Sequence, residues 1–267
     1  MKIKFVKMTG AGNDFIMLDN RDGRFSNILN PTMIEKLCRR AISIGADGLI
    51  AIESSKTTAF SMKYFNSDGS RASMCGNGAR CICQYANLLG IVEAGKEFTF
   101  TSDAGKHIGL VTSTDEARIW LTEPKIFFLN RSIIKQNPIE VSFADTGVPH
   151  VVVFSEDIND GSFEEQSHIL RSHPEFGEAG TNVNWVKLLS DGSLVMRTFE
   201  RGVEAETLAC GTGAVASALI SSELYDSVNL PVAIKVKSGL TLKVGKDLKG
   251  WWLQGHALLV YTGEIQL

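Results

Sequence analysis

A five-residue pattern, Cys-Gly-x-Gly-Ala, occurs twice and constrains the fold more than any other feature of the chain. The first copy is Cys75–Ala79 and the second is Cys210–Ala214. Each copy follows a stretch with alternating apolar residues, typical of a strand, and precedes an apolar stretch rich in small residues, typical of a helix. Each cysteine is therefore expected at the N-terminus of a helix.

Landmarks outside the pattern recur at nearly the same spacing of about 135 positions, which is the signature of a tandem repeat. They are Thr9-Gly10 with Thr146-Gly147, Gly45 with Gly180, Phe65 with Phe199, and Gly105 with Gly239. One such pair could arise by chance, but an ordered series at one offset argues against it. The expected fold is α+β, a pseudo-symmetric duplication of two domains: 1–119, with 256–267 returning to it, and 120–255.

Four helices are expected among many strands. The stretch 78–89 is apolar nearly all round, as a buried central helix is, so a sheet should wrap around it. The stretch 214–224 is its counterpart in the second domain. Helices are also predicted at 31–43, where Pro31 marks the start, and at 164–171.

Composition and charge argue against some classes of function. The net charge of the 267 residues is −3 and no long basic run exists, so nothing suggests a nucleic-acid partner. The chain begins with a strand-like segment, without a charged-then-apolar leader, and no apolar run has the length of a membrane span. We expect a soluble cytoplasmic protein with no membrane partner.

Five cysteines is an odd number, and their spacing fits neither a disulfide framework nor a zinc site. Reduced thiols and no bound metal are expected. Cys38, Cys81 and Cys83 lie in apolar helix-like stretches and are predicted to be core residues. Cys75 and Cys210 differ because glycines flank them at helix starts.

Two thiols at two helix starts suit one kind of chemistry. Ligands favour the crevice between domains, so the active site is expected in the cleft between the repeats, with Cys75 opposite Cys210. A helix N-terminus binds a carboxylate and lowers the pKa of a thiol. One thiolate could remove an α-proton while the other thiol protonates the opposite face, which inverts the α-carbon. No glycine-rich phosphate cradle with a Schiff-base lysine is evident, so no cofactor is expected.

The whole chain resembles the cofactor-independent diaminopimelate epimerases of the lysine and peptidoglycan pathway. The residues that carry the resemblance are Gly10–Phe15, Asn66–Ser70 leading to Met74–Gly78, and Glu200–Gly202 leading to Thr207–Gly213. The resemblance implies two domains, each a mixed sheet curled around a central helix, and a homodimer. It implies an isomerase that interconverts LL-2,6-diaminopimelate and meso-2,6-diaminopimelate.

The resemblance also assigns roles to individual residues. Cys75 and Cys210 would be the acid/base pair, and His150 and Glu200 would tune the two thiols. The reacting carboxylate would be held by the amides of Gly76, Asn77, Gly211 and Thr212. The distal end of the substrate would be held by Asn13, Asn66, Asn182, Glu200 and Arg201, although Asn66 and Asn182 could instead be turn-forming asparagines.

Two positions depart from the family pattern. Many members carry asparagine before the Pro-His pair, where this chain has Val148, and that asparagine contacts substrate. Many also carry glutamine where this chain has Gly48. Neither change affects the proton-transfer pair, but a main-chain contact or a water would have to replace the asparagine, or the substrate pose would differ.

Three other functions compete. A proline or hydroxyproline racemase would leave Glu200 and Arg201 unpaired, because its substrate has no distal ammonium and carboxylate. A thiol redox protein would be expected to carry a Cys-x-x-Cys motif in its site, which the paired pattern lacks. A module that only captures amino acids would need the helix amides but not both sulfurs.

Overall fold

The computed structural model describes residues 2–133 and 138–266, and the chain divides into two compact units. Unit 1 is Met1–Trp120 with Gln254–Leu267, and unit 2 is Leu121–Leu253. The sequence placed the divisions after 119 and 255. Residues 1, 134–137 and 267, which the expected domains include, lie outside the described residues. That the two units are epimerase domains stays a prediction at this point.

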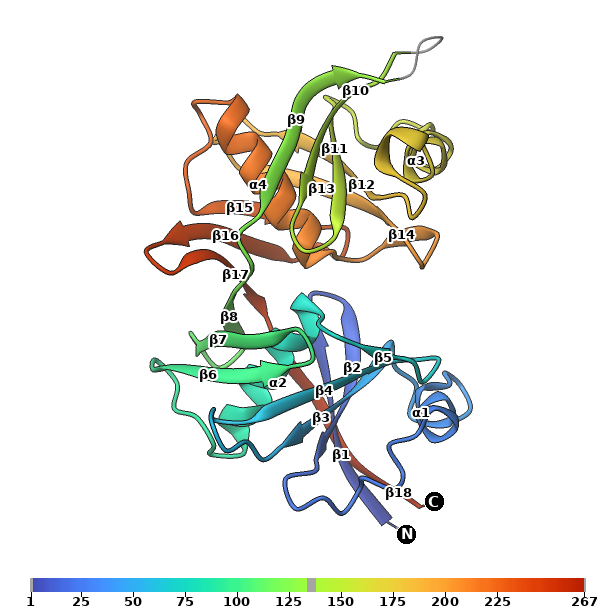
Figure 1. The fold of residues 1–267 in the computed structure, drawn as a ribbon, viewed down its shortest axis with the longest axis vertical. Helices are drawn as coiled ribbons and strands as arrows, with labels where there is room; N and C mark the ends of the chain where they lie inside the picture. Colours follow the sequence, from blue (N-terminus) through green and yellow to red (C-terminus); the bar gives the residue numbers. More distant parts are fainter. Residues whose placement is uncertain (1, 134–137, 267) are drawn as a thin grey trace. The chain divides into compact units, whose positions relative to one another are not determined.

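Unit 1 is a curled sheet with one helix inside it and one outside it (Figure 1). Its helices are α1 (Pro31–Cys38) and α2 (Gly76–Leu88). Its strands are β1 (Lys2–Gly10), β2 (Asn13–Asp19), β3 (Gly48–Glu53), β4 (Ser61–Asn66), β5 (Arg71–Ala72), β6 (Glu97–Ser102), β7 (Gly105–Val111), β8 (Glu116–Trp120) and β18 (Leu258–Gln266).

The sheet of unit 1 is mixed. Along β18, β1, β2, β3, β4, β6, β7 and β8, neighbouring strands are antiparallel except at two steps, β2 with β3 and β4 with β6, which are parallel. Strand β18 comes from the end of the chain and pairs with β1 from its beginning. Parallel neighbours require a crossover, and α1 supplies the one between β2 and β3.

Helix α2 is the central helix of unit 1. It packs against β1, β2, β3, β7 and β8, and its residues from Asn77 to Ala86 are all buried. Cys81 and Cys83 lie on this helix and Cys38 ends α1, and all three are buried as expected. Burial raises the pKa of the Cys81 thiol to about 12, so this cysteine stays a neutral core residue.

Helix α1 is shorter than the sequence suggested. It begins at Pro31, as expected, but it ends at Cys38 instead of continuing to residue 43. The chain then turns, and Ala41 and Gly45 both adopt positive φ angles of 64° and 75°. The turn brings Gly45 and Ala46 back to the carbonyls of Leu37 and Cys38, which replaces the last helical turn.

Unit 2 contains a second curled sheet with its own helices (Figure 1). Its helices are α3 (Phe163–Arg171), the short 3₁₀ helix η1 (Pro174–Phe176) and α4 (Gly211–Leu224). Its strands are β9 (Lys125–Ser132), β10 (Glu140–Asp145), β11 (Pro149–Phe154), β12 (Asn182–Leu188), β13 (Leu194–Glu200), β14 (Ala205–Thr207), β15 (Val232–Lys235), β16 (Thr241–Asp247) and β17 (Gly250–His256), whose last three residues belong to unit 1.

The connectivity of unit 2 repeats that of unit 1. Strands β9, β10, β11, β12, β13, β15 and β16 pair in this order, and the two parallel steps again fall at equivalent places, β11 with β12 and β13 with β15. Helix α4 packs inside the sheet against β10, β11, β12, β15 and β16, and α3 packs outside on β12 and β13. The protein is therefore an α+β tandem duplication, as expected from the repeated cysteine pattern.

Two further features of the fold were not expected. Strand β9 was missed because its side chains are mostly exposed and Glu123-Pro124 had suggested a break in regular structure. Both central helices also begin earlier than predicted, at the residue directly after the cysteine.

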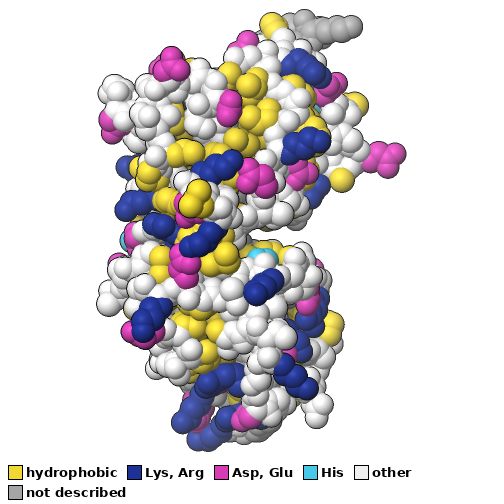
Figure 2. Space-filling view, turned by 60° about the vertical axis from the view of Figure 1, so that its left-hand side comes forward, with side chains coloured by type: hydrophobic (Ala, Val, Ile, Leu, Met, Phe, Trp, Pro, Cys, Tyr) yellow, Lys and Arg dark blue, Asp and Glu magenta, His cyan; other side chains and the backbone are white. Residues whose placement is uncertain are grey.

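Charged side chains of both signs are mixed over the face shown in Figure 2, in agreement with the small net charge. Among the described residues, none of the helices has the length and apolar character needed to cross a membrane.

Candidate active site

Cys75 occupies the N-cap of α2 in unit 1. Its backbone is extended (φ −142°, ψ 123°), its carbonyl accepts from the amide of Ala79, and its Sγ accepts from the amide of Gly78 at 3.5 Å. Gly76 and Asn77 form the first turn, where backbone N–H groups have no acceptor within the helix. The positive end of the helix dipole favours an anion beside Cys75.

Gly10 allows this helix start to approach the end of β1. A Cβ atom at residue 10 would lie 2.7 Å from the carbonyl oxygen of Asn77 and 3.1 Å from Sγ of Cys81. Only a residue without a side chain fits between β1 and α2 at this point. The glycine in the Thr9-Gly10 turn therefore has a packing role next to the first cysteine.

Asn13 is oriented toward Cys75 by Asp47. The Asn13 amide nitrogen donates to Asp47 Oδ2 at 2.6 Å, and the Asn13 amide oxygen lies 3.7 Å from Cys75 Sγ. An ionised carboxylate can only accept, so the contact with Asp47 identifies the nitrogen of the Asn13 amide. The oxygen is thereby the atom that faces the thiol.

Asp47 belongs to a cluster of charged groups behind Asn13. Arg40 bridges Asp14 and Asp47 with contacts of 2.5 and 2.7 Å, and the buried Lys7 ammonium lies 2.7 Å from Asp14. Burial by itself would raise the pKa of Asp14, but hydrogen bonds from Arg40 and Lys7 outweigh it and lower this pKa to about 2. Asp14 is therefore ionised at neutral pH.

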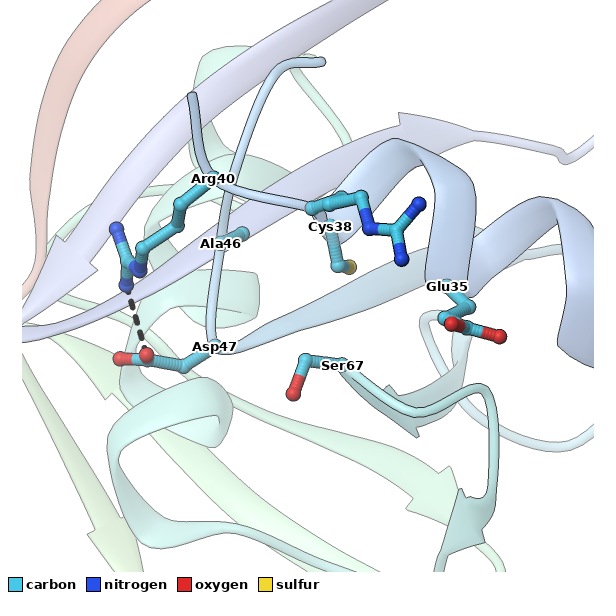
Figure 3. A pocket seen from close by; sticks show the side chains of 7 residues that line it. Glu35, Cys38, Arg40, Ala46, Asp47 and Ser67 are labelled. Carbon is cyan, nitrogen blue, oxygen red and sulfur yellow. Dashed lines mark hydrogen bonds and ion pairs between the residues drawn. The ribbon is translucent and has the colours of Figure 1, made fainter. Parts of the chain in front are cut away.

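Figure 3 shows the Arg40–Asp47 ion pair at the side of a cavity of about 320 Å³ in unit 1. Ser67 faces the cavity from the loop after β4, and Cys38 and Glu35 face it from α1. Arg39 and Ala46 complete its lining.

Two other expected residues of unit 1 make local contacts. The Asn66 amide nitrogen donates to Ser70 Oγ at 3.0 Å, within the turn that follows β4, as a turn-forming asparagine does. The Asn77 amide oxygen accepts from the fully buried Arg80 guanidinium at 2.9 Å, so this side chain is engaged inside the unit. The role expected of Asn77 concerns its backbone amide and not this side chain.

Cys210 occupies the equivalent N-cap of α4 in unit 2. Its backbone is again extended (φ −118°, ψ 110°), and its carbonyl accepts from the amide of Ala214. Its Sγ lies 3.4 Å from the hydroxyl oxygen of Thr212, which in turn lies 3.0 Å from Nε2 of His150. The structure therefore places three expected site residues, Cys210, Thr212 and His150, in one hydrogen-bonded series.

His150 is fully buried, and burial lowers its pKa to about 3, with a smaller contribution from the positive charge of Arg201. The imidazole is therefore neutral at physiological pH. It can act on Cys210 only through the direction of its hydrogen bonds and not through a charge.

Asn182 and Arg201 are joined at the strand ends of unit 2. The Asn182 amide oxygen accepts from the backbone N–H of Arg201 at 2.9 Å, and its nitrogen donates to the carbonyl of Pro149 at 3.2 Å. The Arg201 guanidinium donates to the carbonyl of Gly180 at 3.3 Å. Glu200 ends β13, where its carbonyl accepts from Glu204 and begins the turn that carries Arg201.

The departure at Gly48 has a local steric reason. A Cβ atom at residue 48 would lie 2.6 Å from the carbonyl oxygen of Phe65 and 2.8 Å from the ring of Tyr64. The departure at Val148 lies in the turn before β11, where its carbonyl accepts from the amide of Thr146.

Sequence reasoning missed several polar residues next to the site, namely Lys7, Arg40, Asp47 and Asn184. None of them belongs to a repeated pattern. Asp47 had one visible signal, its position two residues after the Gly45 landmark, whereas Asn184 had only its place two residues after Asn182.

Comparison with solved structures identifies the same fold in proteins of low sequence identity. A phenazine biosynthesis protein of the PhzF family from Bacillus anthracis superposes with a TM-score of 0.75 at 14% identity, over 100% of both chains. A probable proline racemase from Agrobacterium radiobacter gives a TM-score of 0.69 at 14% identity, over 99% of this chain and 93% of that one. These likenesses establish the fold alone.

Comparison of sequences is more specific. The diaminopimelate epimerase family matches residues 5–124 and 142–266. A diaminopimelate epimerase from Chlorobaculum tepidum is 40% identical over 97% of this chain and 100% of its own length, and one from Aquifex aeolicus is 36% identical over 98% of both. With a match across both units and relatives of this similarity over their full lengths, the chain belongs to the diaminopimelate epimerase family.

Proposed function

We propose that this protein interconverts LL-2,6-diaminopimelate and meso-2,6-diaminopimelate by proton transfer at one α-carbon, with Cys75 and Cys210 as the two proton-transfer groups. Such an enzyme is an isomerase that supplies precursors of lysine and peptidoglycan. The observation that carries the proposal is that the two cysteines cap the central helices of two units with the same strand connectivity, in a chain of this family.

The chemistry follows from the two helix starts. A thiolate at one cysteine takes the α-proton and becomes a thiol, and the thiol at the other cysteine gives its proton to the opposite face and becomes a thiolate. The negative charge that develops at the substrate carboxylate is stabilised by the amides of Gly76, Asn77, Gly211 and Thr212. The reaction is balanced without an oxidant, a metal or a cofactor.

The distal ammonium and carboxylate of diaminopimelate require partners of opposite charge and amide groups. Arg201 and Glu200 supply both charges from one turn, and Asn182 is bonded to the backbone of the same turn. Asn13 and Asn66 would contribute from unit 1. A proline-type substrate has no distal ammonium and carboxylate that could use these two charges, which favours diaminopimelate over the substrates of the racemases that share the fold.

A cytoplasmic location and a homodimer belong to the same proposal, on the strength of the family resemblance. Light scattering of the purified protein tests the dimer: a mass of twice 29.1 kDa is expected. A monomer that is fully active would contradict it.

The direct test uses the purified protein with LL-diaminopimelate and follows the appearance of the meso isomer by chiral chromatography. Activity should persist with chelator and without pyridoxal phosphate, and Cys75→Ala and Cys210→Ala should each abolish it. Cys38→Ala is the matched control, because Cys38 is a buried core thiol at the end of α1. If either active-site variant kept wild-type turnover, the assignment of the pair would be wrong.

A further inference from the structure

Asn184 lies behind His150 in unit 2 and belongs to the polar series that ends at Cys210. It is on β12, which runs parallel to β11, and its side chain is fully buried between these strands and α4. Its amide nitrogen lies 3.0 Å from Nδ1 of His150 and 2.9 Å from the carbonyl oxygen of Val151. Its amide oxygen accepts from the Thr198 hydroxyl at 3.0 Å.

These contacts fix the direction of the hydrogen bonds between Asn184 and His150. The Val151 carbonyl can only accept, so the atom next to it is the amide nitrogen of Asn184, which has two hydrogens. The second hydrogen points to Nδ1 of His150, so Nδ1 must be the acceptor. A neutral imidazole carries its proton on the other nitrogen in that case, and the low pKa of His150 keeps the ring neutral.

The tautomer of His150 also affects the hydrogen bond between Thr212 and Cys210. The Nε2–H of His150 donates to the Thr212 oxygen, so the Thr212 hydroxyl hydrogen does not point to the ring and can be donated to Cys210 Sγ. A hydrogen bond received by a sulfur stabilises its thiolate form. With the opposite tautomer, Nε2 would accept the Thr212 hydrogen and the sulfur would lose this donor.

Gly213 provides an independent sign that the structure accommodates Asn184. A Cβ atom at residue 213 would lie 2.3 Å from the Asn184 amide oxygen, so the glycine directly after Thr212 leaves room for this amide. The second glycine of the Cys-Gly-x-Gly pattern thus packs on Asn184 in unit 2, whereas its counterpart Gly78 faces the apolar Ile50 in unit 1.

We propose that Asn184 is a positioning residue for Cys210: it fixes His150 as the Nε2–H tautomer, which makes the Thr212 hydroxyl a donor to the sulfur and favours the thiolate. The proposal rests on the proposed proton-transfer role of Cys210. Arg201 is a charged group whose field acts on His150. The surroundings of Cys75 differ, because Asn13 presents an amide oxygen to its sulfur.

The first test is spectroscopic and needs no substrate. Protein labelled with ¹⁵N in its histidines and ¹³C at the cysteine β-carbons reports the His150 tautomer and the ionisation of each thiol. The wild-type protein should show the Nε2–H tautomer for His150. In Asn184→Leu the tautomer signal should become mixed, and the pKa of Cys210 should rise by about one unit, a tenfold smaller thiolate fraction near neutral pH.

Cys75 is the internal reference, and its titration should not change in Asn184→Leu. Ser217→Ala is the matched control, because Ser217 is a fully buried hydroxyl on α4 that bonds Met196 and not the series. This control should lose stability without a change in the Cys210 titration. A wild-type Nδ1–H tautomer, or an unchanged Cys210 titration in Asn184→Leu, would overturn the proposal.

A second pair of variants serves if Asn184→Leu does not fold. Thr212→Val removes the hydroxyl between His150 and Cys210, and Thr212→Ser keeps it. The valine variant should raise the proton affinity of the Cys210 thiolate about tenfold, which is a rise of about one unit in its pKa. The serine variant should restore the wild-type pKa. Equal titrations in the two variants would refute the proposal. Because these readouts use no substrate, they stay informative even if Cys210→Ala kept epimerase activity and the proposed function failed.

Discussion

The carboxylate of Asp47 accepts a hydrogen bond of 2.6 Å from the amide nitrogen of Asn13, and the amide oxygen of Asn13 faces Cys75 Sγ at 3.7 Å. The first cysteine therefore faces an acceptor, and the second faces a hydroxyl that His150 makes a donor. Two equivalent helix starts are thus given different polar surroundings, and an enzyme that needs one thiol and one thiolate at a time has a use for that difference.

Removing the Asp47 carboxylate should disturb the orientation of Asn13. We expect Asp47→Ala to lower kcat/KM by roughly tenfold to a hundredfold, because a hydrogen bond to a charged group contributes about 1.5 to 3 kcal/mol. Steady-state kinetics with LL-diaminopimelate measures the effect. Asp22→Ala is the control, since Asp22 forms an exposed local pair with Arg24, and it should behave as wild type. Equal kinetics in both variants would mean that Asp47 does not orient Asn13 for catalysis.

The Lys7–Asp14–Arg40 contacts predict a pH dependence of stability. The pKa of Asp14 is lowered to about 2 in the folded protein, below its ordinary value of 3.8, so the unfolded chain binds the proton more readily. The stabilisation is fully present above about pH 4 and is lost as the pH falls toward 2. Urea unfolding of Asp14→Asn and wild type should therefore differ by about 1 to 2 kcal/mol at pH 7 and converge near pH 2. A constant difference across that range would contradict the assignment.

His150 should remain neutral while the enzyme works. Its folded pKa of about 3 lies below the ordinary value of 6.5, so the unfolded chain takes up a proton first as the pH falls. The stability that depends on the neutral ring is complete above about pH 6.5 and declines between that pH and about 3. Titration of the His150 ring signals by NMR should show no protonation at pH 5. A midpoint near 6 would mean that the ring is not held as the structure has it.

Gly10→Ala tests the close approach of β1 to α2. The added Cβ would meet the carbonyl of Asn77, so the start of α2 should shift, with a loss of roughly 1 to 3 kcal/mol of stability and a lower kcat/KM. Gly161→Ala is the same substitution at a site where nothing lies within 4 Å, and it should be silent. Unchanged activity in Gly10→Ala would mean that the close approach of β1 to α2 does not help to position the active site.

The repeated pattern was enough to predict the duplication, the two central helices and the place of the cysteines on them. These features depend on local sequence: apolar residues all round a helix, and a cysteine followed by glycines at its start. Strand β9 could not be predicted in the same way, because an edge strand with exposed side chains has no alternating apolar pattern.

The residues that orient the polar partners of the cysteines, Asn184 and Asp47, could not be predicted from the sequence for a different reason. Asn184 meets His150 only because β11 and β12 run parallel with Val152 opposite Asn184, and Asp47 meets Asn13 only because β2 and β3 are parallel neighbours. Such contacts are set by strand register, and the sequence around a single asparagine or aspartate does not reveal that register.

The central claim, that two cysteines transfer protons at opposite faces of one carbon, is tested most directly by the reaction in deuterium oxide. Starting from LL-diaminopimelate, mass spectrometry at early times should find deuterium at the inverted carbon of the meso product, because the delivering thiol has exchanged with solvent, while the remaining substrate keeps its protium. Meso product that retains the original protium would mean that a single base serves both faces, and it would contradict the assignment of Cys75 and Cys210 as a pair.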